Sequence, residues 1–574
     1  MDTSMASPSQ RRRRFSWKAP AIILGFELLE SIAFSAVALN LVVYMAAVLH
    51  GTLAFNAAHV DTWNGTTFIV PVLGAFLADS YWGKYRTILF SLLFYLAGLV
   101  LLTVSAAVPS LRPAPCSGPG PCSPATGTQF SVLFLALYLI SIGTGGVKSA
   151  LLPFGAEQYE RDGDDDGEDG PAPEKKQSFF SWFFGAINLG IFVAGTLVSW
   201  VEQNVSWALG FGIATLCLLV AAASFLAGTP CYRVRFPTGD SPLKGILRVL
   251  VAAVRNWRRP LPPDGDGLYE VDDDKKKKDA DEKLAHTEGL RWLDKAAVRG
   301  GGGPWEVCTV SEVERVKVLA RMVPIWVTCV LYAASLGQMT TTFIQQGMAM
   351  DTRLFGGRFR VPVASLVSVE VVFMLLWVLL HDVVVMPVAR RCRPGGLTQL
   401  QRMGVGRLLV VVSMATAALV ERRRLRGEKR SMSIAWQVPQ FVVLAGSDVF
   451  GGIAQLEFFY GEAPGSMRSI CSAFSFLALS LGFYVNSLVV TIVAAVTKRH
   501  DGSGGWLAPD LDAGHLDYYF WLWAVISVAN LGLYLLIAGR YKSKRLSPSP
   551  TTTNANASSS SPPNDLLPSH YCSS

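Results

Sequence analysis

Twelve long apolar runs constrain the fold of this chain more than any other feature. Each is long enough to cross the hydrocarbon core of a bilayer as a helix, which takes about 20 residues. They lie at about 19–49, 62–82, 86–108, 128–152, 181–201, 205–227, 318–346, 361–388, 404–421, 433–459, 466–496 and 516–540. A backbone in lipid must satisfy its own hydrogen bonds, so such runs fold as helices. The sequence therefore predicts an all-α polytopic membrane protein whose twelve transmembrane helices are divided six and six by a polar gap.

The composition supports this class and argues against others. Of 574 residues, 51% are hydrophobic and 16% charged, with a mean hydropathy of +0.35, whereas soluble domains carry about 25% charged residues. The net charge of +8 is better explained by membrane topology than by nucleic acid. The spans hold no metal-spaced Cys/His cluster, nucleophile elbow or phosphate loop. We therefore expect no enzyme, cofactor, metal, nucleic acid or obligate protein partner.

Charge and composition divide the chain into five parts. These are a basic cytosolic tail (1–18), a six-helix bundle (19–227), a cytosolic linker (228–316), a second six-helix bundle (317–541) and a disordered cytosolic tail (542–574). The linker contains DDDKKKK and GGGG, which is typical of a flexible connector with room for one amphipathic helix.

Lysine and arginine predict the orientation of the bundles. They gather near both termini, in the second short loop and around 390–402, so both termini are expected in the cytosol. The basic segment 421–430 (ERRRLRGEKR) falls on the outer side and conflicts with this rule. The membrane is either the plasma or the vacuolar membrane. Cys116 and Cys122, in a Pro/Gly-rich loop, form either a small disulfide loop or two free thiols.

The first apolar run carries two acids at a spacing that places them on one helix face. Glu27 and Glu30 are three residues apart. A carboxylate facing lipid at the middle of a bilayer costs about 2.5–3.5 kcal/mol on insertion scales. Both acids should therefore point into a protein interior or a water-filled cavity, where intramembrane acids are commonly functional.

Several stretches together resemble one family of transporters. GAFLADSYWGKYRT (74–87) and FFSWFFGAINLGIF (179–192) are similar to the two signature stretches of the proton-coupled oligopeptide transporter (POT/PTR) family. Further matches lie at 143–160, 338–351, 438–469 and 506–521, and the set resembles the plant nitrate and peptide transporter (NRT1/PTR) branch in particular. The resemblance implies the major facilitator fold, with two six-helix bundles that alternate between inward-open and outward-open states.

The resemblance also implies roles for individual residues. Glu27 and Glu30 match the family's paired acids, which act in proton coupling, but Ser31 stands where the family has Lys or Arg. Lys148 matches an intramembrane lysine and is the candidate replacement cation, for both proton coupling and substrate binding. Asp448 occupies a position that is usually glutamate and is implied to bind substrate. Gln338 is a neutral hydrogen-bonding candidate for the substrate cavity.

Charged residues at the helix ends are candidates for gates or latches. Asp79, Lys84 and Arg86 lie in the turn between the second and third spans, where an acid and bases can hold two helices together. Glu457 is a candidate partner for Arg468 in the second bundle.

These features predict a secondary-active transporter of a small solute. Nitrate, a di- or tripeptide, or another small organic anion would move with protons by alternating access across the bilayer. Because Ser31 removes the expected base, two alternatives stay open. One is a proton-independent facilitative carrier, and the other is a non-transporting sensor on a transporter scaffold.

Overall fold

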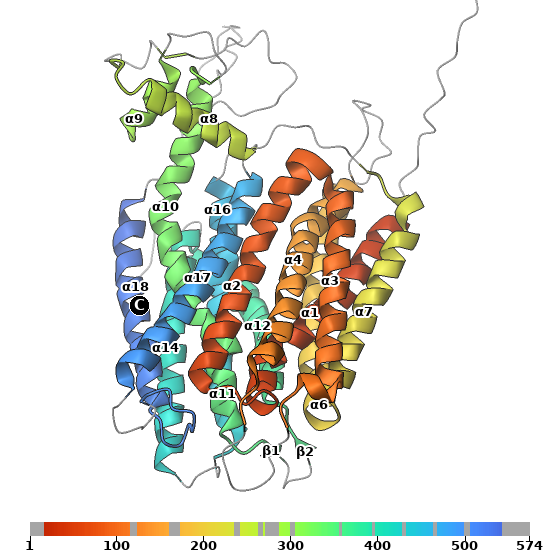
Figure 1. Cartoon of the computed structure of the whole chain (residues 1–574). Helices are drawn as coiled ribbons and strands as arrows, with labels where there is room; N and C mark the ends of the chain where they lie inside the picture. Colours follow the sequence, from red (N-terminus) through yellow and green to blue (C-terminus); the bar gives the residue numbers. More distant parts are fainter. Residues whose placement is uncertain are drawn as a thin grey trace, which may run out of the picture.

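The chain folds into two helical bundles side by side, with a small helical cap at one end (Figure 1). The computed structural model describes residues 17–114, 123–159, 173–234, 242–261, 268–269, 286–298, 305–354, 359–392, 396–427, 432–462, 468–498 and 505–541. The basic tail, the Cys116–Cys122 loop and the carboxyl tail lie outside these residues. We call the end that carries α8 and α9 the cap end, and the opposite end, with β1 and β2, the hairpin end.

The first bundle is built from residues 18–227. Its helices are α1 (Lys18–Ala47), α2 (Leu53–Leu77), α3 (Lys84–Ala107), α4 (Gly127–Glu157), α5 (Pro173–Val193), α6 (Ser199–Asn204) and α7 (Trp207–Ala227). Two π-helical segments, η1 (Ala78–Trp82) and η3 (Ala194–Val198), extend α2 and join α5 to α6. Gly83, with φ of 77°, makes the sharp turn from η1 into α3.

The second bundle repeats this plan. It contains α10 (Val310–Leu336), η8 (Gly337–Thr340), α11 (Thr342–Met348), α12 (Leu366–Leu380), η10 (His381–Val385), α13 (Met386–Cys392), α14 (Gln399–Arg426), α15 (Val438–Ser447), η12 (Asp448–Ile453), α16 (Ala454–Glu462), α17 (Arg468–Thr497) and α18 (Leu516–Arg540). The hairpin of β1 (Arg353–Leu354) and β2 (Phe359–Arg360) closes one end. Threonine capping boxes begin α4, α10 and α14.

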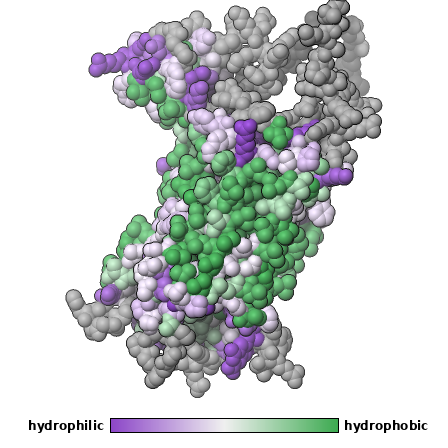
Figure 2. Space-filling model, turned by 45° about the vertical axis from the view of Figure 1, so that its right-hand side comes forward, coloured by the Kyte–Doolittle hydropathy of each residue, from purple (hydrophilic) through white to green (hydrophobic). Residues whose placement is uncertain are grey.

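The predicted all-α, two-bundle membrane fold is confirmed. Eleven segments in the described part of the chain are long and apolar enough to cross a membrane, and Figure 2 shows a hydrophobic surface across the middle of the face in view. α2 completes the set of twelve, but its buried Asn56, Asp61 and Asn64 lower its hydropathy. The predicted boundary at 62 was too late, because this polar part of α2 faces protein rather than lipid.

The cap shows that the described part of the linker is folded. α8 (Pro242–Arg255), α9 (Arg291–Asp294) and η7 (Lys295–Ala297) enclose an apolar cluster made of Val249, Ala252, Ala253, Leu268, Leu293, Ala296, Ala297, Cys308, Val313 and Val316. Arg248 pairs with Glu312, which fixes the cap to the start of α10. The composition predicts a flexible connector here, because its short apolar stretches bury their side chains only against residues of α10 such as Val313 and Val316.

The basic segment that conflicts with the positive-inside rule is partly neutralised inside the protein. Arg424 is only 4% exposed and pairs with Glu421 at 2.8 Å and with Asp512. Arg423 stacks on Trp436, with the guanidinium 4.3 Å from the ring centroid. These contacts tie the end of α14 to neighbouring segments. Two of the arginines therefore serve the fold, which weakens their value as topology signals.

Candidate functional site

The two acids of α1 are buried inside the first bundle. Glu27 is 4% exposed and Glu30 is fully buried. One oxygen of Glu30, Oε1, accepts hydrogen bonds from Tyr95 of α3 at 3.1 Å and from Thr144 of α4 at 2.8 Å. Its other oxygen, Oε2, is buried without a hydrogen-bond partner. Glu30 is therefore held through one carboxylate oxygen, while the other has no hydrogen-bond partner.

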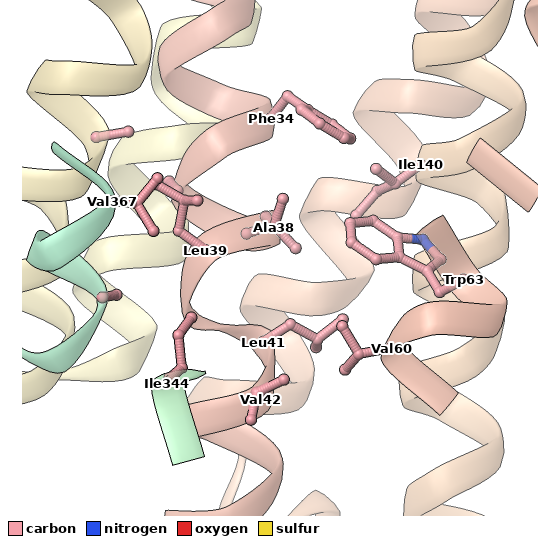
Figure 3. Close-up of a cluster of buried hydrophobic side chains, with 14 of the residues drawn as sticks. Phe34, Ala38, Leu39, Leu41, Val42, Val60, Trp63, Ile140, Ile344 and Val367 are labelled. Atoms are coloured by element: carbon pink, nitrogen blue, oxygen red, sulfur yellow. The ribbon is translucent and has the colours of Figure 1, made fainter. Parts of the chain in front are cut away.

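Lys148 lies on α4 beside these acids. Its ammonium sits 3.8 Å from the centroid of the Phe34 ring, a cation–π geometry. Phe34 in turn points from α1 toward Trp63 and Ile140 (Figure 3), and its ring stacks on Trp63 with centroids 5.9 Å apart. Lys148 is within electrostatic range of Glu27, yet it forms no ion pair with any described residue. The ammonium is thus positioned by an aromatic ring and stays available to an anion.

The packing around Ser31 explains why a small residue fits there. A Cβ placed on Gly190 of α5 would lie 2.5 Å from the Cβ of Ser31 and 3.1 Å from the Leu28 carbonyl oxygen. The backbones of α1 and α5 therefore approach closely at this point. A lysine or arginine at position 31 would have to extend along the groove between the helices.

The close contact of α3 and α4 also positions Glu30, and this yields a first prediction. A Cβ on Gly143 would lie 2.3 Å from the Cβ and 2.6 Å from the backbone nitrogen of Tyr95. We expect Gly143→Ala to lower the free energy of unfolding by about 1–3 kcal/mol through overpacking, and to reduce transport by displacing Tyr95. Thermal unfolding in detergent measures the first effect. Gly212→Ala is the control, since its Cβ would meet its nearest atom at 3.9 Å.

The second bundle holds another set of charged groups. Asp448 lies at the start of η12 next to Tyr332, whose hydroxyl also bonds to Ser447 at 2.9 Å. Glu370 of α12 is 5% exposed and close enough to Asp448 for the two carboxyl groups to interact. Arg407 of α14 is 2% exposed and lies over the Tyr332 ring at 5.3 Å. The structure therefore places an acid pair and a cation in this bundle, as in the first, although Arg407 is buried and Lys148 is half-buried.

Gln338 belongs to a polar network that links the bundles. Its Nε2 donates to Asn486 at 2.5 Å, and its Oε1 accepts from Thr342 at 2.6 Å. Asn486 donates to Asp61 of α2 at 2.7 Å, and Tyr519 donates to Asn486 at 3.3 Å. Both ends of the Gln338 amide thus meet protein groups, so the structure directs this residue toward the contact between bundles.

The hydrogen bonds between the bundles concentrate from the middle of the helices to the hairpin end. Four hydrogen bonds between α2 and α17 form a set that we call the α2–α17 ladder. They join Asp61 to Asn486, Thr62 to Ser487 (2.9 Å), Thr66 to Tyr484 (2.9 Å) and the Gly65 carbonyl to Ser480 (2.7 Å). Gln345 of α11 adds a bond to the Leu53 carbonyl at 3.1 Å. The bundles are therefore closed against each other toward the hairpin end.

The predicted latch residues lie at the cap end. Lys84 pairs with Glu157 across α3 and α4, close to Asp79 in η1. Arg86 is exposed one turn away.

In the second bundle, Glu457 pairs with Arg402 at 2.7 Å. The side chain of Arg468 lies outside the described residues, so its pairing with Glu457 stays a prediction. Both latches therefore join a base at the start of one helix to an acid near the end of the next.

Sequence reasoning did not single out Asp61, Glu202, Glu370 and Arg407. Each is at most 5% exposed. Glu370 and Arg407 lie within predicted spans, whereas Asp61 and Glu202 lie just outside them. The rule that drew attention to Glu27 and Glu30, that charges inside spans are costly and face protein, would have found Glu370 and Arg407.

One group of residues in the cap has the spacing of a metal site. His286, Asp294 and Glu314 bring their ligand atoms within 4.8 Å of one another. However, the ammonium of buried Lys317 lies 2.6 Å from Asp294 and 2.8 Å from Glu314. This cation already balances both carboxylates, so we assign the group a structural role.

The two bundles, the buried acids and the unpaired lysine define the class of protein, a multi-pass membrane transport protein of the major facilitator type. Comparison with known proteins identifies the group within that class. The POT family profile (PTR2) matches residues 85–507, and the chain belongs to this family. It is a transporter family, not an enzyme family.

Relatives and solved structures agree with this assignment. The chain is 41% identical to Protein NRT1/ PTR FAMILY 8.5 of Arabidopsis thaliana, with 94% of this chain and 92% of the relative covered. It is 40% identical to Protein NRT1/ PTR FAMILY 8.3 of the same plant, with 94% of each covered. An auto-inhibited POT family peptide transporter shares the fold with a TM-score of 0.70 at 21% identity, covering 93% of this chain and 99% of that one.

Proposed function

We propose that this protein carries a small solute across the membrane together with protons, by alternating access. The observation that carries the proposal is the arrangement of Glu30, Glu27 and Lys148 in the first bundle. Glu30 has one buried oxygen without a hydrogen-bond partner, and the Lys148 ammonium forms no ion pair with a described carboxylate, although it lies within electrostatic range of Glu27. A buried charge is costly unless it is paired, so protonation of the acids and binding of an anion at Lys148 would stabilise the same state.

The proposed cycle follows from the closed hairpin end. We infer that the cap end is cytosolic, which makes this an inward-facing arrangement. Opening of the α2–α17 ladder would expose the acids and Lys148 to the outside, where both proton and solute bind. Neutralisation lets the ladder close again. Release of the solute to the cytosol then follows deprotonation of Glu27 and Glu30.

Lys148 and Asp448 support a solute with an anionic group. Lys148 would bind a carboxylate or nitrate, and Asp448 in the opposite bundle would bind an ammonium where the solute has one. Nitrate, di- or tripeptides and other small organic anions fit this description. Among POT family structures of the same fold, one at a TM-score of 0.61 and 13% identity is described in complex with 5-aminolevulinic acid. We assign Gln338 to closure of the hairpin end, because its amide is engaged there.

Uptake at two pH values tests the proposal. Oocytes expressing the protein should accumulate labelled nitrate or a labelled dipeptide faster at an external pH of about 5.5 than at about 7.5, because the acids must be protonated from outside. Lys148→Ala should reduce uptake by roughly tenfold or more, with surface expression measured in parallel. Accumulation of no anionic solute at either pH would contradict the proposal.

The absence of a base at position 31 favours a second candidate function, that of a facilitative carrier. This candidate predicts a flux that does not change with external pH but still depends on Lys148. The same uptake measurements separate the two, since only coupled transport moves solute against its gradient when the inside is alkaline.

A further inference from the structure

A cavity at the cap end of the second bundle lies apart from the acids and Lys148. Its volume is about 480 Å³, within the range of small-molecule sites. Its walls come from α12, η10, α13, α14, η12 and α16, and its lining residues are Val378, His381, Asp382, Met386, Arg390, Arg402, Val449, Ile453 and Glu457.

The polar groups of this cavity are mostly hydrogen-bond donors with unused capacity. Arg402 is 8% exposed; one of its terminal nitrogens bonds to Glu457 at 2.7 Å, while its Nε is buried without a partner. His381 is 7% exposed and bonds to Asp382 through Nδ1 at 2.8 Å, while its Nε2 is buried without a partner. Arg390 brings a third basic group and forms no ion pair with any described residue.

The two acids that line the cavity do not pair with all of its basic groups. Glu457 and Asp382 each have one basic partner already, and their side chains are 43% and 70% exposed. Water therefore screens their charge more than that of the buried groups. An oxyanion in the cavity would meet the guanidinium groups of Arg402 and Arg390, the donor type that binds phosphate in a bidentate manner.

We propose that this cavity binds a phosphate-type oxyanion, carried by the headgroup of an anionic lipid or by free phosphate. The surface beside it suits a lipid. Val383, Val384 and Leu456 are 64%, 46% and 49% exposed on the same elements, where acyl chains would lie. Basic pockets between helices on the cytosolic side are suited to acidic headgroups. The proposal does not depend on the transported solute.

Binding to the full-length protein tests the proposal with two probes. Titration of inorganic phosphate into detergent-purified protein, followed by calorimetry, reports free phosphate. Native mass spectrometry after incubation with phosphatidic acid or phosphatidylcholine reports the headgroup. We expect saturable binding of at least one phosphate probe, and little retention of phosphatidylcholine. Binding of the lipid alone identifies a headgroup site, and binding of free phosphate alone identifies a phosphate site. If neither binds, the proposal is wrong.

Matched variants locate the site. Arg390→Gln should weaken binding by about tenfold or more without breaking an ion pair, whereas Arg391→Gln removes the same charge from an exposed neighbour that does not line the cavity. Equal losses in both variants would show nonspecific attraction and overturn the site.

Discussion

Glu30→Gln is expected to abolish proton-driven uptake while leaving the protein folded. Glutamine keeps the oxygen that accepts from Tyr95 and Thr144, whose donors lie 3.1 and 2.8 Å from Oε1. It replaces the unpartnered Oε2 with an uncharged NH₂ group. The variant therefore resembles a permanently protonated acid, which can enter the neutral state of the cycle but is unable to release a proton to the cytosol.

Proteoliposomes separate these two steps. Uptake driven by an inward proton gradient should fall by roughly tenfold or more. Counterflow exchange of labelled for unlabelled solute needs no net proton release and should persist. Loss of both would mean that Glu30 serves binding or folding rather than coupling, and retention of both would assign coupling to Glu27 or to another acid.

Glu202→Gln is the matched control. Glu202 is also a buried acid of the first bundle, 1% exposed, and it accepts a hydrogen bond from Asn40 near the hairpin end. Glu202 forms no hydrogen bond or ion pair with Lys148. A loss of coupling in this variant equal to that in Glu30→Gln would show that any buried acid of the bundle has the same effect.

Much of the fold could be predicted from the sequence, because lipid imposes a simple rule on apolar length. The span expected at 516–540 coincides with α18 (Leu516–Arg540). The span expected at 86–108 differs from α3 (Lys84–Ala107) by at most two residues at either end. The rule failed at α2, whose first half carries Asn56, Asp61 and Asn64. Asn56 and Asp61 are fully buried against protein, and hydropathy does not distinguish that environment from water.

The contacts between the site residues were harder to predict from the sequence than the identity of those residues. The buried position of Glu30 followed from the cost of a charge in lipid, but Tyr95 and Thr144 come from other helices, and only the packing of α1, α3 and α4 brings them together. The described partner of Glu457, Arg402 at 2.7 Å, lies on α14, and only the packing of α14 beside α16 brings the two together.

The α2–α17 ladder leads to the second major prediction. Gly65→Leu should prevent the hairpin end from closing. A Cβ on Gly65 would lie 3.1 Å from the Ser480 carbonyl oxygen and 3.1 Å from two ring carbons of Tyr484, so the larger leucine side chain has no space in the closed arrangement. Overpacking of this kind typically costs about 1–3 kcal/mol. A cost of about 1.4 kcal/mol already shifts a two-state equilibrium tenfold.

The leucine is free of this clash once α2 and α17 separate, so the open arrangement keeps its stability. We therefore expect expression to be preserved and uptake to fall by about tenfold or more. Gly25→Leu should leave uptake intact, since a Cβ at Gly25 meets no atom within 4 Å.

Disulfide trapping reports the closure itself. The Thr62 and Ser487 hydroxyl oxygens are 2.9 Å apart, so the pair Thr62→Cys and Ser487→Cys should cross-link in the otherwise unchanged protein when the ladder is closed. Adding Gly65→Leu should reduce the cross-linked fraction, and adding Gly25→Leu should not. If Gly65→Leu lowers uptake while cross-linking stays complete, the ladder closes despite the leucine, and the loss of transport must come from another step. If cross-linking and uptake fall together, closure of α2 on α17 is a required step of transport, because the substitution lies on the contact between bundles and touches neither Glu30 nor Lys148.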